Sequence, residues 1–179
     1  MKTLVIGLGN PILTDDGVGV YVAWAVRNAL PPEADVDVIE LSLGGLSLME
    51  AMVGYERVIL VDALLAPPEE AGQVVQFNAG HLPATLNSAS AHDVDLPTAL
   101  QVGRRLGASL PDDENIQIVA IKAHEVLTFG GSPTPPVRAA IPEATVRVLG
   151  LLGVLLDPAG GDESVPSRPT VNGGSDGLS

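Results

Sequence analysis

Two aspartates and one histidine are spaced along this sequence so that they could meet at a single metal ion. Asp16 closes a glycine-rich stretch behind the first apolar segment, Asp62 follows directly on an apolar run, and His92 precedes an amphipathic segment. Carboxylate and imidazole groups together form a hard-to-borderline ligand set that suits a first-row divalent cation. Because three protein ligands leave coordination positions open, this set is typical of a working metal site and not of a structural one.

The two carboxylates also have other interpretations. Asp15 and Asp16 stand where a helix is expected to begin, and aspartate is a good helix N-cap. Asp62 is harder to explain structurally, because an unpaired carboxylate at the end of a buried strand is costly and such acids are common in functional sites. Either Asp16 or Asp62 is also suited to act as a general base toward water, and the residues alone do not choose between them.

The three histidines occupy different positions relative to the expected strands. His92 lies before a helix, where it is either a ligand or a turn residue. His81 falls in a loop. His124 follows the last expected strand, and it becomes the candidate ligand if His92 lies on the opposite edge of the sheet.

Apolar segments of two kinds alternate along the chain and predict the elements that position these residues. Apolar and β-branched runs indicate strands over residues 2–6, 36–41, 57–61, 72–77 and 116–121, and helical spacing indicates helices from about residue 16 and over 46–53, 93–107 and 135–156. Pro142 either kinks or restarts the last helix. Strands separated by helices predict a three-layer α/β sandwich with a mostly parallel, twisted sheet.

In sheets of this kind, ligands bind beyond the carboxyl ends of the strands. We therefore expect Asp16, Asp62 and His92 at that edge, within about 8 Å of one another, since a shared cation demands short bonds to each.

The composition bounds the fold and excludes several classes of function. The chain has 179 residues and is 46% hydrophobic, so we expect one α/β domain over 1–156, followed by a Gly-, Pro- and Ser-rich disordered tail over 157–179.

Nine basic and 22 acidic residues give a net charge of −13, which is the wrong sign for binding nucleic acid through its phosphates. The absence of cysteine excludes disulfides, a thiol nucleophile and a sulfur-based zinc site. No apolar run approaches the roughly 20 residues of a membrane span and no signal peptide is visible, so we expect a cytoplasmic protein without a membrane segment.

The stretch Gly7-Leu8-Gly9-Asn10 begins like a dinucleotide-binding loop. Ile12 stands where the third glycine of that pattern would be, and Asp15 and Asp16 would repel a pyrophosphate at the helix N-terminus. The sequence therefore argues against nucleotide binding.

Four segments together resemble the hydrogenase maturation protease family. They are Gly7-x-Gly9-Asn10, Asp15-Asp16-Gly17-x-Gly19, Val61-Asp62-Ala63 and Ser90-Ala91-His92. The resemblance spans about residues 2 to 155 and implies an α/β endopeptidase that trims the C-terminus of the large subunit of a nickel–iron hydrogenase. It also implies that Asp16, Asp62 and His92 face the nickel that the large-subunit precursor already carries, so that the metal arrives with the substrate. We expect the protease itself to be a monomer.

One segment departs from the pattern of that family. Many members have an acidic Asp-Gly-Gly turn after the second strand, whereas here Ser42 stands near that position, ahead of Gly44 and Gly45. The acid is either absent or displaced to Glu40. This leaves open which hydrogenase subgroup is processed.

Two other functions share features with this sequence. Peptidyl-tRNA hydrolase also has a Gly-Leu-Gly-Asn-Pro stretch after its first strand, but it carries a Thr-Arg-His-Asn segment soon afterwards, where this chain has Thr14-Asp15-Asp16-Gly17. A non-catalytic nickel-sensing or chaperone-like module would use the same three ligands without cutting a chain. No Ser-His-Asp or Cys-His arrangement supplies a nucleophile that would exclude it.

Overall fold

The computed structural model of the protein describes residues 1–82 and 95–154. The strands are β1 (Thr3–Leu8), β2 (Val36–Leu41), β3 (Arg57–Leu65), β4 (Val74–Asn78) and β5 (Ile116–Ala123). The helices are α1 (Val18–Ala29), α2 (Gly45–Ala51), α3 (Leu96–Arg105) and α4 (Pro135–Leu152). Short 3-10 turns lie at η1 (Pro68–Glu70), η2 (Ala79–His81) and η4 (Asp113–Asn115).

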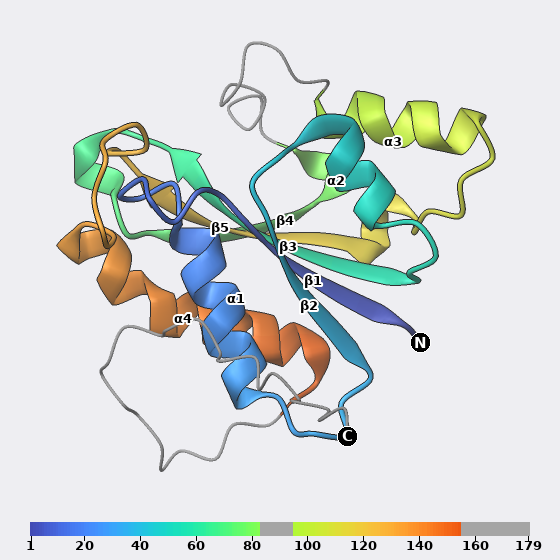
Figure 1. Ribbon diagram of the computed structural model, residues 1–179, viewed down its shortest axis with the longest axis horizontal. Helices are drawn as coiled ribbons and strands as arrows, with labels where there is room; N and C mark the ends of the chain where they lie inside the picture. The colour runs from blue at the N-terminus through green and yellow to red at the C-terminus, as the bar shows by residue number, and fades with distance from the viewer. Residues whose placement is uncertain (83–94, 155–179) are drawn as a thin grey trace, which may run out of the picture.

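The strands form one sheet in the order β2-β1-β3-β5-β4. β1, β2, β3 and β5 pair in parallel, and β4 is antiparallel to β5. Helices α1 and α4 cover one face of the sheet, while α2 and α3 cover the other (Figure 1). The predicted three-layer α/β sandwich with a mostly parallel sheet is therefore confirmed.

Both faces of the central strand β3 are buried, which is why its sequence is apolar without alternation. Ile59 and Val61 point into the core shared with α1 and α4, and Val58 and Leu60 point into the core shared with α2 and α3. All four side chains are at most 2% exposed. Residues of β3 with even numbers, Asp62 among them, therefore share the face of α2 and α3.

Glycines allow α1 to begin directly against the sheet. A Cβ atom on Gly19 would lie 2.3 Å from the carbonyl oxygen of Val61 and 2.4 Å from that of Leu8. A Cβ atom on Gly7 would lie 2.4 Å from the carbonyl oxygen of Gly19. Real Cβ atoms cannot come so close to backbone, so the spacing of these glycines brings the start of α1 against β1 and β3.

Some element boundaries differ from those the sequence predicts. β3 continues to Leu65, so Asp62 lies inside the strand and not directly after it. The strand is longer because residues 62–65 keep pairing with β5, a partner that no local pattern reveals. α4 runs from Pro135 to Leu152 as one helix, so Pro142 does not restart it.

The expected tail over 157–179 lies outside the described residues, as does His92. Among the helices that are described, none is long and apolar enough to cross a membrane.

Candidate active site

Asp16 lies in the loop between β1 and α1, and its side chain is held by that same loop. Its Oδ2 accepts a hydrogen bond of 2.7 Å from the backbone N–H of Asn10. Gly9 permits this closure, because it has a φ of +121° and a Cβ atom there would lie 1.8 Å from the Asp16 carbonyl oxygen. The N-cap of α1 is Gly17, which makes no side-chain capping bond. The alternative that Asp15 or Asp16 is the N-cap of this helix is therefore wrong.

Asp62 lies in β3, where it pairs with Ala120 of β5. Its side chain is half-buried, and its Oδ1 accepts a 2.8 Å hydrogen bond from the N–H of Ala63. Removal from water raises the pKa of the Asp62 carboxyl from its usual 3.8 to about 7. The negative charge of Asp16 acts in the same direction, and the hydrogen bond from Ala63 opposes it.

The negative charge of Asp16 raises the pKa of the Asp62 carboxyl at the carboxyl edge of the sheet. β1 and β3 are neighbours, with Gly7 paired to Val61, so the loop after β1 lies next to Asp62. The pKa of Asp62 responds to the charge of Asp16, as expected of two acids that share one site. A cation between them would relieve this repulsion.

The third predicted ligand, His92, lies outside the described residues. Within residues 1–82 and 95–154, no group of three or more His, Cys, Asp or Glu side chains is arranged to hold a metal ion. The described residues therefore show no metal site by themselves, and the roles of Asp16, Asp62 and His92 as metal ligands stay predictions.

The other two histidines are poorly placed to complete the site. His124 lies four residues beyond Ala120, the strand partner of Asp62, which corresponds to about 13 Å along a strand. Its Nδ1 is 3.3 Å from the carbonyl oxygen of Ala66. His81 follows β4, which runs antiparallel to its neighbour and so ends at the opposite edge of the sheet.

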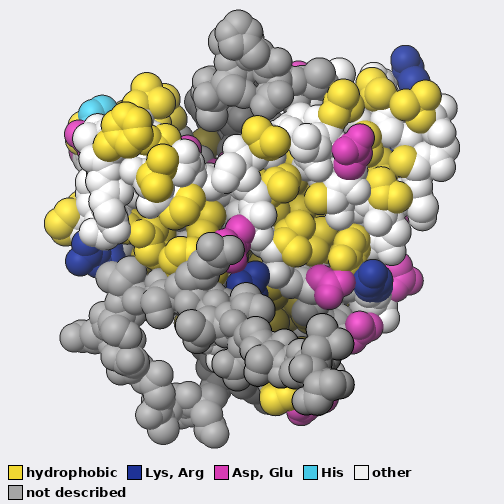
Figure 2. Space-filling model, viewed as in Figure 1, with side chains coloured by type: hydrophobic (Ala, Val, Ile, Leu, Met, Phe, Trp, Pro, Cys, Tyr) yellow, Lys and Arg dark blue, Asp and Glu magenta, His cyan; other side chains and the backbone are white. Residues whose placement is uncertain are grey.

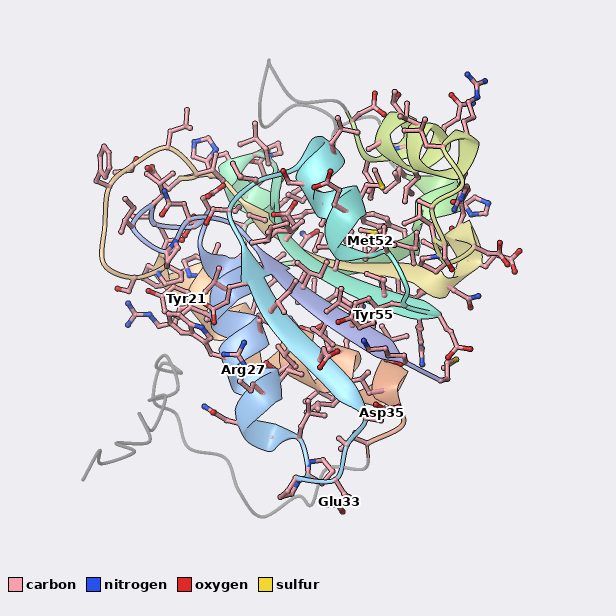
Figure 3. The ribbon with its side chains drawn as sticks, turned by 45° about the vertical axis from the view of Figure 1, so that its right-hand side comes forward. Tyr21, Arg27, Glu33, Asp35, Met52 and Tyr55 are labelled. Carbon is pink, nitrogen blue, oxygen red and sulfur yellow. The ribbon has the colours of Figure 1, made fainter. Side chains whose placement is uncertain are left out.

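The segment that departs from the family pattern places its acid away from the site. Glu40 accepts a 3.1 Å hydrogen bond from Nη1 of Arg27, which reaches from α1 to β2 (Figure 3). Ser42 instead lies next to the first loop, and its hydroxyl donates to the carbonyl oxygen of Gly9 at 3.3 Å. Glu40 is thus engaged with α1, and the acid of the family turn has no substitute among these residues.

Asp15 has a different role from the cap that the sequence suggests. Its carboxylate is buried, with 1% exposure, and accepts hydrogen bonds from Thr134 and Glu125, which lie in the segment between β5 and α4. No local pattern reveals these bonds, because the partners lie 110 and 119 residues away in the sequence.

A comparison with models of protein families finds a family that matches most of this chain. The model of the hydrogenase maturation protease family matches residues 20–151. The chain belongs to this family. The protease is 27% identical to the hydrogenase 2 maturation protease of Escherichia coli K12 over 153 residues, which are 85% of this chain and 91% of that protein. It is 26% identical to the hydrogenase expression/formation protein HupD of Rhizobium leguminosarum over 92% of this chain and 82% of that protein.

Solved structures agree with this assignment. The hydrogenase maturating endopeptidase HybD from Escherichia coli superposes with a TM-score of 0.72 and 26% identity, covering 86% of this chain and 93% of that one. The hydrogenase 2 maturation peptidase of a Thaumarchaeota archaeon shares the fold with a TM-score of 0.60 at 23% identity, covering 87% of this chain and all of the other. The protein is thus a hydrogenase maturation endopeptidase, and the resemblance found in the sequence is confirmed. This decides against both a non-catalytic module and peptidyl-tRNA hydrolase.

Proposed function

We propose that this protease removes the C-terminal extension of a nickel-loaded large-subunit precursor of a nickel–iron hydrogenase, and that Asp16, Asp62 and His92 recognise the nickel. The observation that carries the proposal is the adjacency of β1 and β3, which brings the loop that holds Asp16 next to Asp62 at the carboxyl edge of the sheet. The names of the relatives, which process or form hydrogenases, support this class of substrate.

Backbone hydrogen bonds orient both carboxylates for this task. One oxygen of Asp16 is bonded to the N–H of Asn10, and one oxygen of Asp62 is bonded to the N–H of Ala63.

Nickel in the precursor serves as part of the substrate. A thiolate-bound nickel ion with open positions accepts hard ligands from Asp16, Asp62 and His92, which fixes the scissile bond relative to the protease. A precursor without nickel lacks this anchor and binds more weakly. One of the two carboxylates also takes a proton from the attacking water, a role for which Asp16 and Asp62 are equally suited.

A protein substrate also needs a surface beside the site. The loops after β1 and β5 pair through a bridge between Leu13 and Phe129, and the N–H of Gly130 donates to the carbonyl oxygen of Ile12 at 3.1 Å. On these loops Ile12, Leu127 and Phe129 are 60%, 82% and 78% exposed. Figure 2 shows hydrophobic side chains gathered at the upper left, over the region of these loops in Figure 1. We name Ile12, Leu127 and Phe129 the apolar rim, and we assign it to contact with the precursor next to the cleaved segment.

The experiment compares cleavage of nickel-loaded and nickel-free precursor by the wild-type protease, by His92→Gln and by the matched variant His124→Gln. Wild type and His124→Gln should cleave only the loaded precursor efficiently, and His92→Gln should cleave neither. Equal cleavage of both precursors by wild type would contradict nickel recognition. Loss of activity in His124→Gln alone would transfer the third ligand to His124.

A further inference from the structure

Asp15 ties together two segments that are distant in sequence. Its Oδ1 accepts a 2.7 Å hydrogen bond from the backbone N–H of Thr134, and its Oδ2 accepts bonds from the Thr134 hydroxyl at 3.0 Å and the N–H of Glu125 at 3.3 Å. The N–H of Asp15 donates to the carbonyl oxygen of Glu125 at 3.2 Å. The loop before α1 is thus joined to both ends of the loop between β5 and α4.

These bonds are not ordinary helix capping. Thr134 is the N-cap of α4, but its side chain makes no capping bond within its own helix, and its hydroxyl donates instead to Asp15. Burial of a carboxylate is costly unless donors surround it, and here three donors converge on one that is 1% exposed. The N-cap of α4 alone would not require the Asp15 carboxylate, which comes from the loop between β1 and α1.

Asp16, the next residue, lies between two fixed points. On one side its Oδ2 is bonded to the N–H of Asn10. On the other side its backbone continues from Asp15, whose carboxylate and N–H are both held by the distant loop. Because Asp15 and Asp16 are adjacent and each is held by hydrogen bonds, we expect a shift of Asp15 to move the Asp16 carboxylate as well.

We propose that Asp15 is a positioning residue, whose buried carboxylate fixes the orientation of Asp16 for the cleavage reaction. The inference rests on the role of Asp16 in the proposed function. It adds a further residue to the site, one that touches neither substrate nor metal and acts only through its neighbour.

The test compares Thr134→Val with Thr134→Ser, since valine removes the hydroxyl donor to Asp15 while serine keeps it. Asp15→Asn is the stronger variant, because an amide NH₂ would face one or two of the present donors. The first measurement is the NMR resonance and hydrogen exchange of the Asn10 amide in the free protein, which report the bond to Asp16. The second is kcat/KM for precursor cleavage at a temperature where every variant is folded.

We expect a displaced Asn10 resonance and faster exchange in Thr134→Val and Asp15→Asn, with kcat/KM lowered roughly tenfold or more, and wild-type behaviour in Thr134→Ser. Asp15→Asn should cost little further activity when it is added to Asp16→Asn, because both changes act at the same carboxylate.

An unchanged Asn10 amide in Thr134→Val and Asp15→Asn would overturn the inference, and so would additive losses in the double variant. Because the amide measurement uses neither nickel nor precursor, it stands apart from the proposed function. The proposed function is contradicted instead if the wild-type protease cleaves nickel-loaded and nickel-free precursor equally well.

Discussion

Asp62 carries a carboxyl group inside a parallel sheet, half-buried and within the field of a second acid. Folding alone gives no reason for this position, since Leu60 and Leu64, which share its face of β3, are buried and apolar. The repulsion between Asp62 and Asp16 is the kind of strain that sites retain for function at some expense of stability.

The raised pKa of Asp62 makes the stability of the free protein depend on pH. A carboxyl with a folded-state pKa of about 7 binds protons more tightly in the folded than in the unfolded chain, so its contribution to stability falls as pH rises from about 4 to above 7. Asp62→Asn keeps the acceptor for the Ala63 N–H and removes the charge. We therefore expect the variant to match wild type near pH 4 and to be more stable at pH 8 by about 1–2 kcal/mol, with partial solvent contact limiting the gain.

Urea unfolding at the two pH values measures this difference. Asp37→Asn is the control, because it also removes a carboxylate charge, at the start of β2 and away from the site, where Asp37 lies 3.8 Å from Nζ of Lys2, and it should gain no stability at pH 8. A wild-type stability equal to that of Asp62→Asn at pH 8 would contradict the strained-carboxylate account.

At this scale the sequence predicts part of the site. Asp16 and Asp62 could be placed at one edge because the carboxyl ends of parallel strands meet there. The buried role of Asp15 could not be predicted, because its donors come from residues 125 and 134 and leave no trace in local patterns. His92 is not among the described residues, so its place at the site stays a prediction.

Among the elements, the contact between β1 and α1 does most to build the site. Gly7 and Gly19 let the helix start against the backbone of the sheet, which brings the loop carrying Asp16 over the end of β3. The glycine spacing was visible in the sequence, but the reason for it, a close approach to the carbonyl oxygen of Val61, depends on the assembled sheet. The antiparallel direction of β4 was likewise not predictable from its short apolar run.

The two paired loops give a prediction about substrate binding. Leu127→Ser and Phe129→Ser remove exposed apolar side chains of the apolar rim and leave both carboxylates in place. We expect KM for the nickel-loaded precursor to rise roughly tenfold in the double variant, as expected when an apolar contact of about 1–2 kcal/mol is lost, with kcat little changed.

Leu106→Ser is the matched control, because Leu106 is 81% exposed at the C-terminal end of α3 and lies outside the two loops. The control should leave KM unchanged. An equal rise of KM in Leu106→Ser, or no rise in the double variant, would show that the rim does not contact the precursor.

For the whole molecule, two cores on opposite faces of one sheet hold most of the buried hydrophobic side chains of residues 1–82 and 95–154. The residues from 157 onward are mostly glycine, proline, serine and acids, with little to bury. We therefore expect that deletion of residues 157–179 changes Tm by no more than about 2 °C in a thermal melt. A larger loss of Tm would mean that this segment docks on the domain and that the boundary at 156 is wrong.

The layers of the fold could be predicted because helix and strand periods alternate along the chain. The strand order could not, because it depends on which strands pair across the sheet, and no local pattern encodes that pairing. The glycine-rich motif after β1 and the aspartate in β3 meet at the carboxyl edge of this sheet, which makes that edge the candidate site.

Cleavage of the nickel-loaded precursor by Asp16→Asn and Asp62→Asn, each paired with a thermal melt, tests whether these two carboxylates recognise the nickel of the substrate. Asparagine keeps the side-chain volume and replaces an anionic ligand with a neutral amide, a much poorer ligand for a divalent cation. The account predicts that both variants fold with a Tm at or above that of wild type and that cleavage is abolished or greatly slowed. Full activity in Asp62→Asn, or a loss of activity that follows unfolding, would contradict recognition of the substrate's nickel by these carboxylates.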